Sequence, residues 1–139
     1  MYLKVEKEKR IADIQKEFNK HYPYLKIEFY NKSHEKNHLS PSSEIIDPGS
    51  RIRSMGLKED FAHINITKDR KVSQVEADFE KDMGLFVQVF RKAGNVWIGT
   101  SRTDGWTLER QNEEGAYFSS EIPIKTIDQK IEENQIDAE

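Results

Sequence analysis

The pattern of apolar and polar positions predicts a strand–helix–strand unit in residues 62–92. Ile64 and Ile66 alternate with polar residues, which is the period of two expected of a half-buried strand. Apolar residues then recur at steps of three and four, on one stripe of an amphipathic helix: Val72, Val75, Phe79 and Met83. Gly84 supplies a helix stop where a left-handed residue is needed. A second strand follows, with one face formed by Leu85, Val87 and Val89.

The first third of the chain repeats this pattern. When Met1 is placed beside Ala62, the residue classes match without a gap as far as Phe18 beside Phe79. One residue is then inserted at Pro23-Tyr24, after which the second strands match. Two interpretations are open: an internal duplication, or two units that look alike because the same periods dictate their apolar spacing. Both give the same element order.

Two such units in series predict the order β-α-β-β-α-β. This order resembles the split unit of ferredoxin-like folds, an α+β architecture in which an antiparallel sheet carries both helices on one face. A hairpin turn is indicated at Lys92–Asn95, which predicts a fifth strand at Val96–Thr100 beside the fourth. A C-terminal helix is then expected through Trp106, ending near Gly115.

Residues 1–124 are expected to form a single domain, because the chain is long enough to close one core. The insert at residues 31–60 is long for a structureless connection, so we expect it to be functional or partly ordered. Within it, Asp47-Pro48 and Gly56 bracket a predicted short helix. Residues 125–139 carry few apolar side chains and are expected to form a weakly ordered tail.

Composition excludes several classes of function. The 139 residues include no cysteine, which removes disulfides, thiolate nucleophiles and cysteine-bound metal centres. The formal net charge is −3, so no overall field draws the protein to nucleic acid or anionic lipid. No apolar run approaches membrane-spanning length, and the charged first residues lack the apolar region of a secretory signal. A cytoplasmic protein without a membrane partner is therefore expected.

A sheet with both helices on one face leaves its other face open. The residues predicted there include many aromatics, whereas water-facing sheet surfaces are normally polar. We expect this face to be covered by a second copy of the chain, by a partner or ligand, or by the chain's own Trp106, Leu108 and Phe118. The predicted partner-binding residues are Tyr24, Tyr30, His63, Phe86, Gln88, Phe90 and Trp97.

The segment His34-Glu35-Lys36-Asn37-His38 matches the motif H-E-x-x-H and resembles zinc-dependent peptidases over these five residues. In that family both imidazoles bind zinc from one helix face and the glutamate activates water. A third ligand would be His63 or Glu59. Two interpretations follow: a metal-dependent hydrolase that uses His34, Glu35 and His38 with zinc as its cofactor, or a polar loop without a cofactor. The polar interior of the motif favours the loop.

Two further binding hypotheses arise from the sequence. Arg91 and Arg102, close in sequence to Trp97 and Trp106, are a candidate anion site, although the tryptophans can equally seal the sheet edge. RNA-recognition motifs share the predicted element order, but the predicted third strand lacks their run of aromatics and glycines. The sequence therefore argues against nucleic acid as a partner.

The sequence as a whole favours a small non-catalytic interaction module. It is expected to form a homodimer, or to dock a protein partner, through the aromatic sheet face and without a cofactor. The alternatives are the zinc-dependent hydrolase and, less specifically, a binder of single-stranded nucleic acid.

Overall fold

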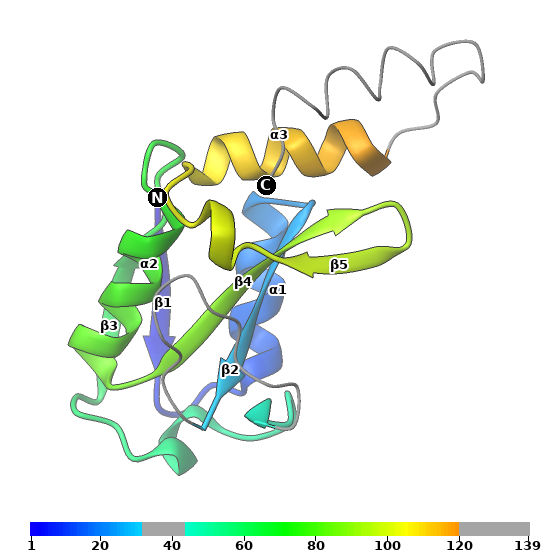
Figure 1. Cartoon of the computed structure of the whole chain (residues 1–139). Coiled ribbons are helices and arrows are strands. Elements are labelled where there is room, and N and C mark those ends of the chain that lie inside the picture. The colour runs from blue at the N-terminus through cyan, green and yellow to red at the C-terminus, as the bar shows by residue number, and fades with distance from the viewer. Residues whose placement is uncertain (32–43, 120–139) are drawn as a thin grey trace, which may run out of the picture.

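The computed structural model describes residues 1–31 and 44–119 (Figure 1). The strands are β1 (Tyr2–Glu6), β2 (Leu25–Tyr30), β3 (Phe61–Asn65), β4 (Phe86–Ala93) and β5 (Val96–Gly99). The α-helices are α1 (Ile11–His21), α2 (Val72–Asp78) and α3 (Leu108–Ser119). Shorter helical turns are η2 (Ile52–Met55), η3 (Phe79–Met83), which continues α2, and η4 (Ser101–Thr103). The mixed α+β class, the hairpin strand β5 and the C-terminal helix are confirmed.

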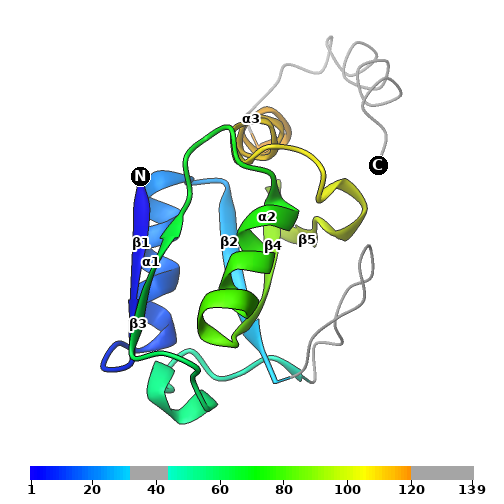
Figure 2. The same cartoon turned by 90° about the vertical axis from the view of Figure 1, so that its left-hand side faces the viewer.

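The strands form two antiparallel sheets. One sheet is β1–β3 and the other is β2–β4–β5. Helix α1 contacts both β1 and β2, and α2 contacts both β3 and β4, so each helix bridges the two sheets. Figure 2 shows β1 beside β3 and, apart from them, β2 beside β4. The ferredoxin-like arrangement, a single sheet with both helices on one face, is therefore not confirmed.

One apolar core joins the two sheets and the helices. The predicted helix stripe is confirmed, because all four of its residues are fully buried: Val72, Val75, Phe79 and Met83. The inner faces of the strands contribute Leu3, Val5, Leu25, Ile27, Phe29, Ile64, Leu85, Val87 and Val89. Burial of apolar surface at about 25 cal/mol per Å² is the main stabilising contribution of such a core.

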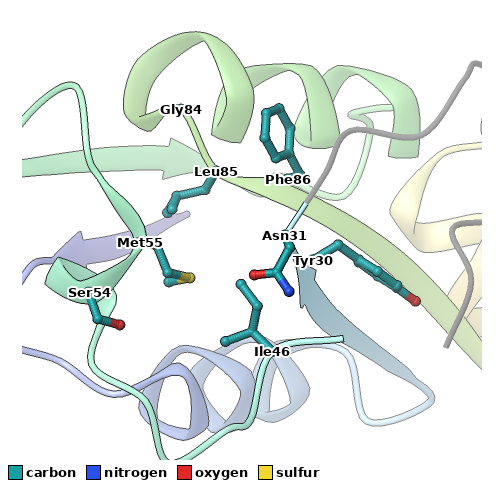
Figure 3. A pocket seen from close by; sticks show the side chains of 8 residues that line it. All are labelled: Tyr30, Asn31, Ile46, Ser54, Met55, Gly84, Leu85 and Phe86. Atoms are coloured by element: carbon teal, nitrogen blue, oxygen red, sulfur yellow. The ribbon is translucent and has the colours of Figure 1, made fainter. Parts of the chain in front are cut away.

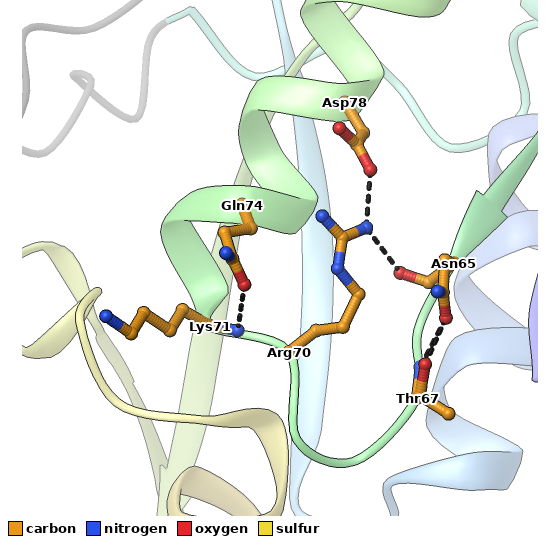
Figure 4. A network of polar contacts seen from close by, with 6 residues as sticks. All are labelled: Asn65, Thr67, Arg70, Lys71, Gln74 and Asp78. Atoms are coloured by element: carbon orange, nitrogen blue, oxygen red, sulfur yellow. Dashed lines mark hydrogen bonds and ion pairs between the residues drawn. The ribbon is translucent and has the colours of Figure 1, made fainter.

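The helices of the two units begin in the same way. The Arg10 N–H donates to the Asp13 carboxylate at 3.0 Å, and the Lys71 N–H donates to Gln74 Oε1 at 2.9 Å (Figure 4). These side chains satisfy a backbone donor that the first turn of a helix leaves open. Figure 4 also shows Arg70, which donates to the carbonyl oxygen of Asn65 on β3 at 3.1 Å. The same guanidinium group pairs with the Asp78 carboxylate on α2.

The first residues of α1 and of α2 each donate a backbone hydrogen bond to a later segment of the chain. The Ile11 N–H donates to Ser50 O and the Val72 N–H donates to Trp106 O, both at 3.0 Å. The alignment that places Met1 beside Ala62 also places Ile11 beside Val72. The internal match of the sequence is thus accompanied by matching backbone hydrogen bonds.

The residues just before α1 and α2 also hold η2 and α3 in equivalent places. The Ile52 N–H donates to Lys9 O at 2.8 Å, and the Leu108 N–H donates to Arg70 O at 2.9 Å. Both apolar side chains are fully buried in the core. The turn η2 therefore occupies, in the first unit, the place that the first turn of α3 occupies in the second. It also confirms the short helix predicted within the insert.

Helix α3 extends beyond its predicted end at Gly115. A Cβ at this position would lie 2.7 Å from the Tyr24 Cβ and 3.1 Å from the Tyr24 carbonyl oxygen. The glycine thus permits close packing against β2 instead of ending the helix, which continues to Ser119. No helix within residues 1–31 and 44–119 is long and apolar enough to cross a membrane. The predicted tail at residues 125–139 lies outside the described residues.

Candidate functional site

The structure divides the predicted partner-binding residues between the two sheets. His63 lies on β3, whereas the others lie on or beside the second sheet: Tyr24, Tyr30, Phe86, Gln88, Phe90 and Trp97. Tyr30 is 3% exposed and Gln88 is fully buried, so a partner cannot reach either side chain. Burial also raises the pKa of the Tyr30 hydroxyl to about 12. These residues therefore do not form one continuous open face.

A lysine side chain covers part of the outer face of the β2–β4–β5 sheet. The Lys26 Nζ lies 5.7 Å from the centre of the Phe90 ring and 5.1 Å from that of Trp97. Cation–π contacts of this length contribute about 0.5–1 kcal/mol at exposed sites. Both aromatic rings are half-buried, so little apolar surface is left open here.

The expected cover by the C-terminal helix falls on a different face. Arg91 shares a face of β4 with the core residue Val89, and α3 packs on that face through Gln111. Leu108 belongs to the core itself. The outer face, which carries Phe90, lies on the opposite side of the strand.

The outer face of the β1–β3 sheet is the more exposed surface. Tyr2 is 60% exposed and Phe61 is 57% exposed. Their ring centres lie 6.4 Å and 5.8 Å from that of His63, which sits between them. Charged residues border the aromatics, and the hydrogen bond from Lys4 lowers the pKa of the Glu6 carboxyl. A pocket of about 370 Å³ lies where β1 ends and β3 begins. It is lined by Lys4, Glu6, Lys7, Glu8, Asp60, Phe61 and His63.

A second pocket, of about 330 Å³, lies where β2 ends and β4 begins. It is lined by Tyr30, Asn31, Ile46, Ser54, Met55, Gly84, Leu85 and Phe86. Figure 3 shows Asn31, Ile46 and Met55 facing one another across this space. The lining combines apolar residues with polar groups, among them the Asn31 amide and the Ser54 hydroxyl. Neither pocket was predicted from the sequence, because segments distant along the chain form both.

The predicted anion pair does not share an environment. Arg91 is 4% exposed and donates from Nη1 to Gln111 Oε1 at 2.9 Å, and burial lowers its pKa. Arg102 is exposed on η4. Trp106 contacts two guanidinium groups, because the Arg91 carbon lies 5.6 Å and the Arg110 carbon 3.7 Å from its ring centre. Trp106 lies just before α3 and Arg110 in its first turn, so their spacing of four residues is the sequence signal for the Trp106–Arg110 pair.

Sequence reasoning missed a buried carboxyl on α2. Glu76 accepts a hydrogen bond from the Val89 N–H at 3.0 Å, at the edge of β4 that β5 leaves uncovered. Burial and the nearby Asp104 raise its pKa to about 8. Gln15, the equivalent residue of α1, donates from Nε2 to Ile27 O at 2.7 Å. The two side chains bond equivalent strand edges with opposite polarity. Glu76 follows Val72 by four residues, so its place on the buried stripe was the available signal.

The candidate zinc motif lies outside the described residues, because His34, Glu35 and His38 fall between the two described ranges. Within those ranges, no group of three or more histidine or acidic side chains is arranged to hold a metal ion. His63 and Glu59, the suggested third ligands, are both exposed near the start of β3.

Comparison with known proteins identifies no relative of this chain. No protein-family model matches the sequence, and neither the curated proteins nor the solved structures contain a significant match.

Proposed function

We propose that the protein is a non-catalytic interaction module that forms a homodimer through the outer face of the β1–β3 sheet. The observation that carries this proposal is the exposure of Tyr2 and Phe61, at 60% and 57%. Both rings lie beside His63 on one sheet face, where clustered apolar surface typically marks an interaction site. Aromatic residues are also enriched in the centres of protein interfaces.

The charges around the aromatics suit a second copy of the same face. Lys4 pairs with Glu6 at 2.9 Å, and Lys7 lies 3.5 Å from Asp60. Because opposite charges alternate on this surface, two copies related by a two-fold axis can meet without net repulsion. The proposal requires neither a metal nor a cofactor. It keeps the cytoplasmic location and the single domain that the sequence predicts.

Native mass spectrometry and sedimentation of the full chain test the proposal. We expect a metal-free dimer, and we expect Phe61→Glu to weaken it by at least about tenfold in Kd, because an aromatic anchor is replaced by a charge without a partner. Val96→Glu is the matched control, since Val96 is 58% exposed but lies on β5. It should leave the dimer unchanged.

A wild-type protein that stays monomeric would refute self-association, as would equal weakening by both glutamate variants. The same spectra report bound metal. One zinc ion per chain that is lost in His34→Ala would support the hydrolase alternative instead.

A further inference from the structure

In the second half of the chain, α3 packs into a seat, which is the surface formed by the start of β2 and the end of β4. Arg91 donates to Gln111 Oε1, and the Tyr24 N–H donates to Asn112 Oδ1, each at 2.9 Å. Gly115 brings the helix backbone against β2 at the closest point. The seat therefore holds its helix through two polar contacts and one close approach.

The first half contains the equivalent seat without an equivalent helix. In the alignment of the two units, Asn31 corresponds to Arg91 and Gly84 corresponds to Tyr24. Asn31 and Gly84 both line the pocket of about 330 Å³. The pocket thus lies at the position that α3 covers in the other unit.

The helix that would fill this seat stops after one turn. Met55, the last residue of η2, corresponds to Gln111 and lines the pocket. Gly56 then adopts a left-handed conformation with φ of 68°, which ends the turn. After Gly56 the chain does not continue as a helix across the seat. It runs instead to the end of η3, where the Lys58 N–H donates to Met83 O at 3.2 Å.

We propose that this pocket docks an acidic amphipathic helix of a partner protein, seated as α3 is seated in the other half. Ile46 and Met55, both half-buried, offer apolar contacts to side chains spaced at three and four residues, and Asn31 offers an amide to one polar group. Gly84, which corresponds to Tyr24, carries no side chain of its own, and the aliphatic part of Lys58 lies against it. A partner helix would therefore meet the Lys58 side chain at this point.

The charge at the rim indicates the acidic character of the helix. The Lys58 side chain lies along Gly84, 3.3 Å from the position of a Cβ there. Lys58 is exposed and forms no ion pair with any residue in the described ranges. An acidic side chain on the docked helix would complement it. In the other half, the negative charge of Glu114 on α3 similarly favours the charged form of Arg91.

The probe for this site is a peptide with the sequence of residues 107–119, capped at both ends, because this segment forms the acidic helix that fills the equivalent seat. It is titrated into the full-length protein, and amide chemical shifts are followed by NMR. We expect saturable shifts at Asn31, Met55 and Gly84. Ser54→Trp, which fills the pocket, should weaken binding at least tenfold, and Lys58→Glu should weaken it severalfold.

Asn95→Trp is the control, because Asn95 is exposed at the hairpin turn, and it should leave binding unchanged. Phe61→Glu should also leave it unchanged, so this inference stands independently of the proposed dimer. Absence of shifts at millimolar peptide would overturn the proposal, as would shifts confined to Tyr24 and Arg91. A change of subunit number in Ser54→Trp would assign the pocket to a second copy instead, and pocket amides already protected from hydrogen exchange would assign it to the chain itself.

Discussion

Replacing Glu76 by glutamine should make the protein more stable in alkaline solution. Burial raises the pKa of this carboxyl from 4.5 to about 8. Because the folded-state pKa lies above the unfolded value, the folded protein binds the proton more tightly between pH 4.5 and 8, and stability falls as the pH rises through this window. At about 1.4 kcal/mol per pKa unit, the full shift is equivalent to roughly 5 kcal/mol. That is a large part of the typical stability of a small domain.

Glutamine keeps an oxygen acceptor for the Val89 N–H but cannot ionise. Glu76→Gln should therefore match the wild type near pH 4 and exceed it by up to ~5 kcal/mol near pH 9. Urea unfolding, followed by tryptophan fluorescence at several pH values, measures this difference. A difference that stays constant with pH would refute the reasoning, as would a wild type that is most stable at pH 9.

The matched exchange is Gln15→Glu, at the equivalent position of α1. Gln15 donates to the Ile27 carbonyl oxygen at 2.7 Å, and an ionised carboxylate cannot donate. The variant should lose stability as the pH rises, because a charge would then face a carbonyl oxygen at a part-buried site. If Gln15→Glu showed no pH-dependent loss, the equivalence of the two edges would not hold energetically.

Two further predictions concern packing and are measured by urea unfolding. Gly115→Ala should cost about 1–3 kcal/mol, because its Cβ would lie 2.7 Å from Tyr24 Cβ, whereas Gly105→Ala, with nothing within 4 Å, should be near neutral; equal effects would contradict the close approach of α3 to β2. Phe79→Ala should cost about 3–5 kcal/mol, because Phe79 is fully buried and packs edge-on against Phe29 at 5.7 Å between ring centres. A loss of less than 1 kcal/mol would contradict its place in the core.

The helix stripes could be predicted from the sequence, whereas the pairing of the strands could not. Val75 and Phe79 are buried because a period of 3.6 residues places them on one face, which is a local property. The separation of β1–β3 from β2–β4–β5 depends on how each helix packs between strands, and no periodicity encodes that. Because the strands form two sheets, His63 on β3 lies in a different sheet from Phe90 on β4.

The candidate site was predictable only in part. The sequence predicted a binding site of aromatic residues on a sheet face, but the most exposed aromatics on a sheet, Tyr2 and Phe61, were not among the predicted site residues. Glu76 was missed because charged residues in a helix are usually exposed, and only its edge contact explains its burial. The internal-duplication hypothesis stays a prediction, now joined by the matching hydrogen bonds.

Gly56 makes the two halves of this molecule differ in accessibility although they share a backbone scheme. A residue that favoured helix at this point, followed by a copy of residues 112–119, would let the first unit build its own covering helix and close its pocket from within. The left-handed φ of 68° at Gly56 ends the turn in the half that keeps a pocket, whereas the other half continues into α3. Converting the pocket into additional core would therefore take both a different residue at position 56 and a helical segment after it.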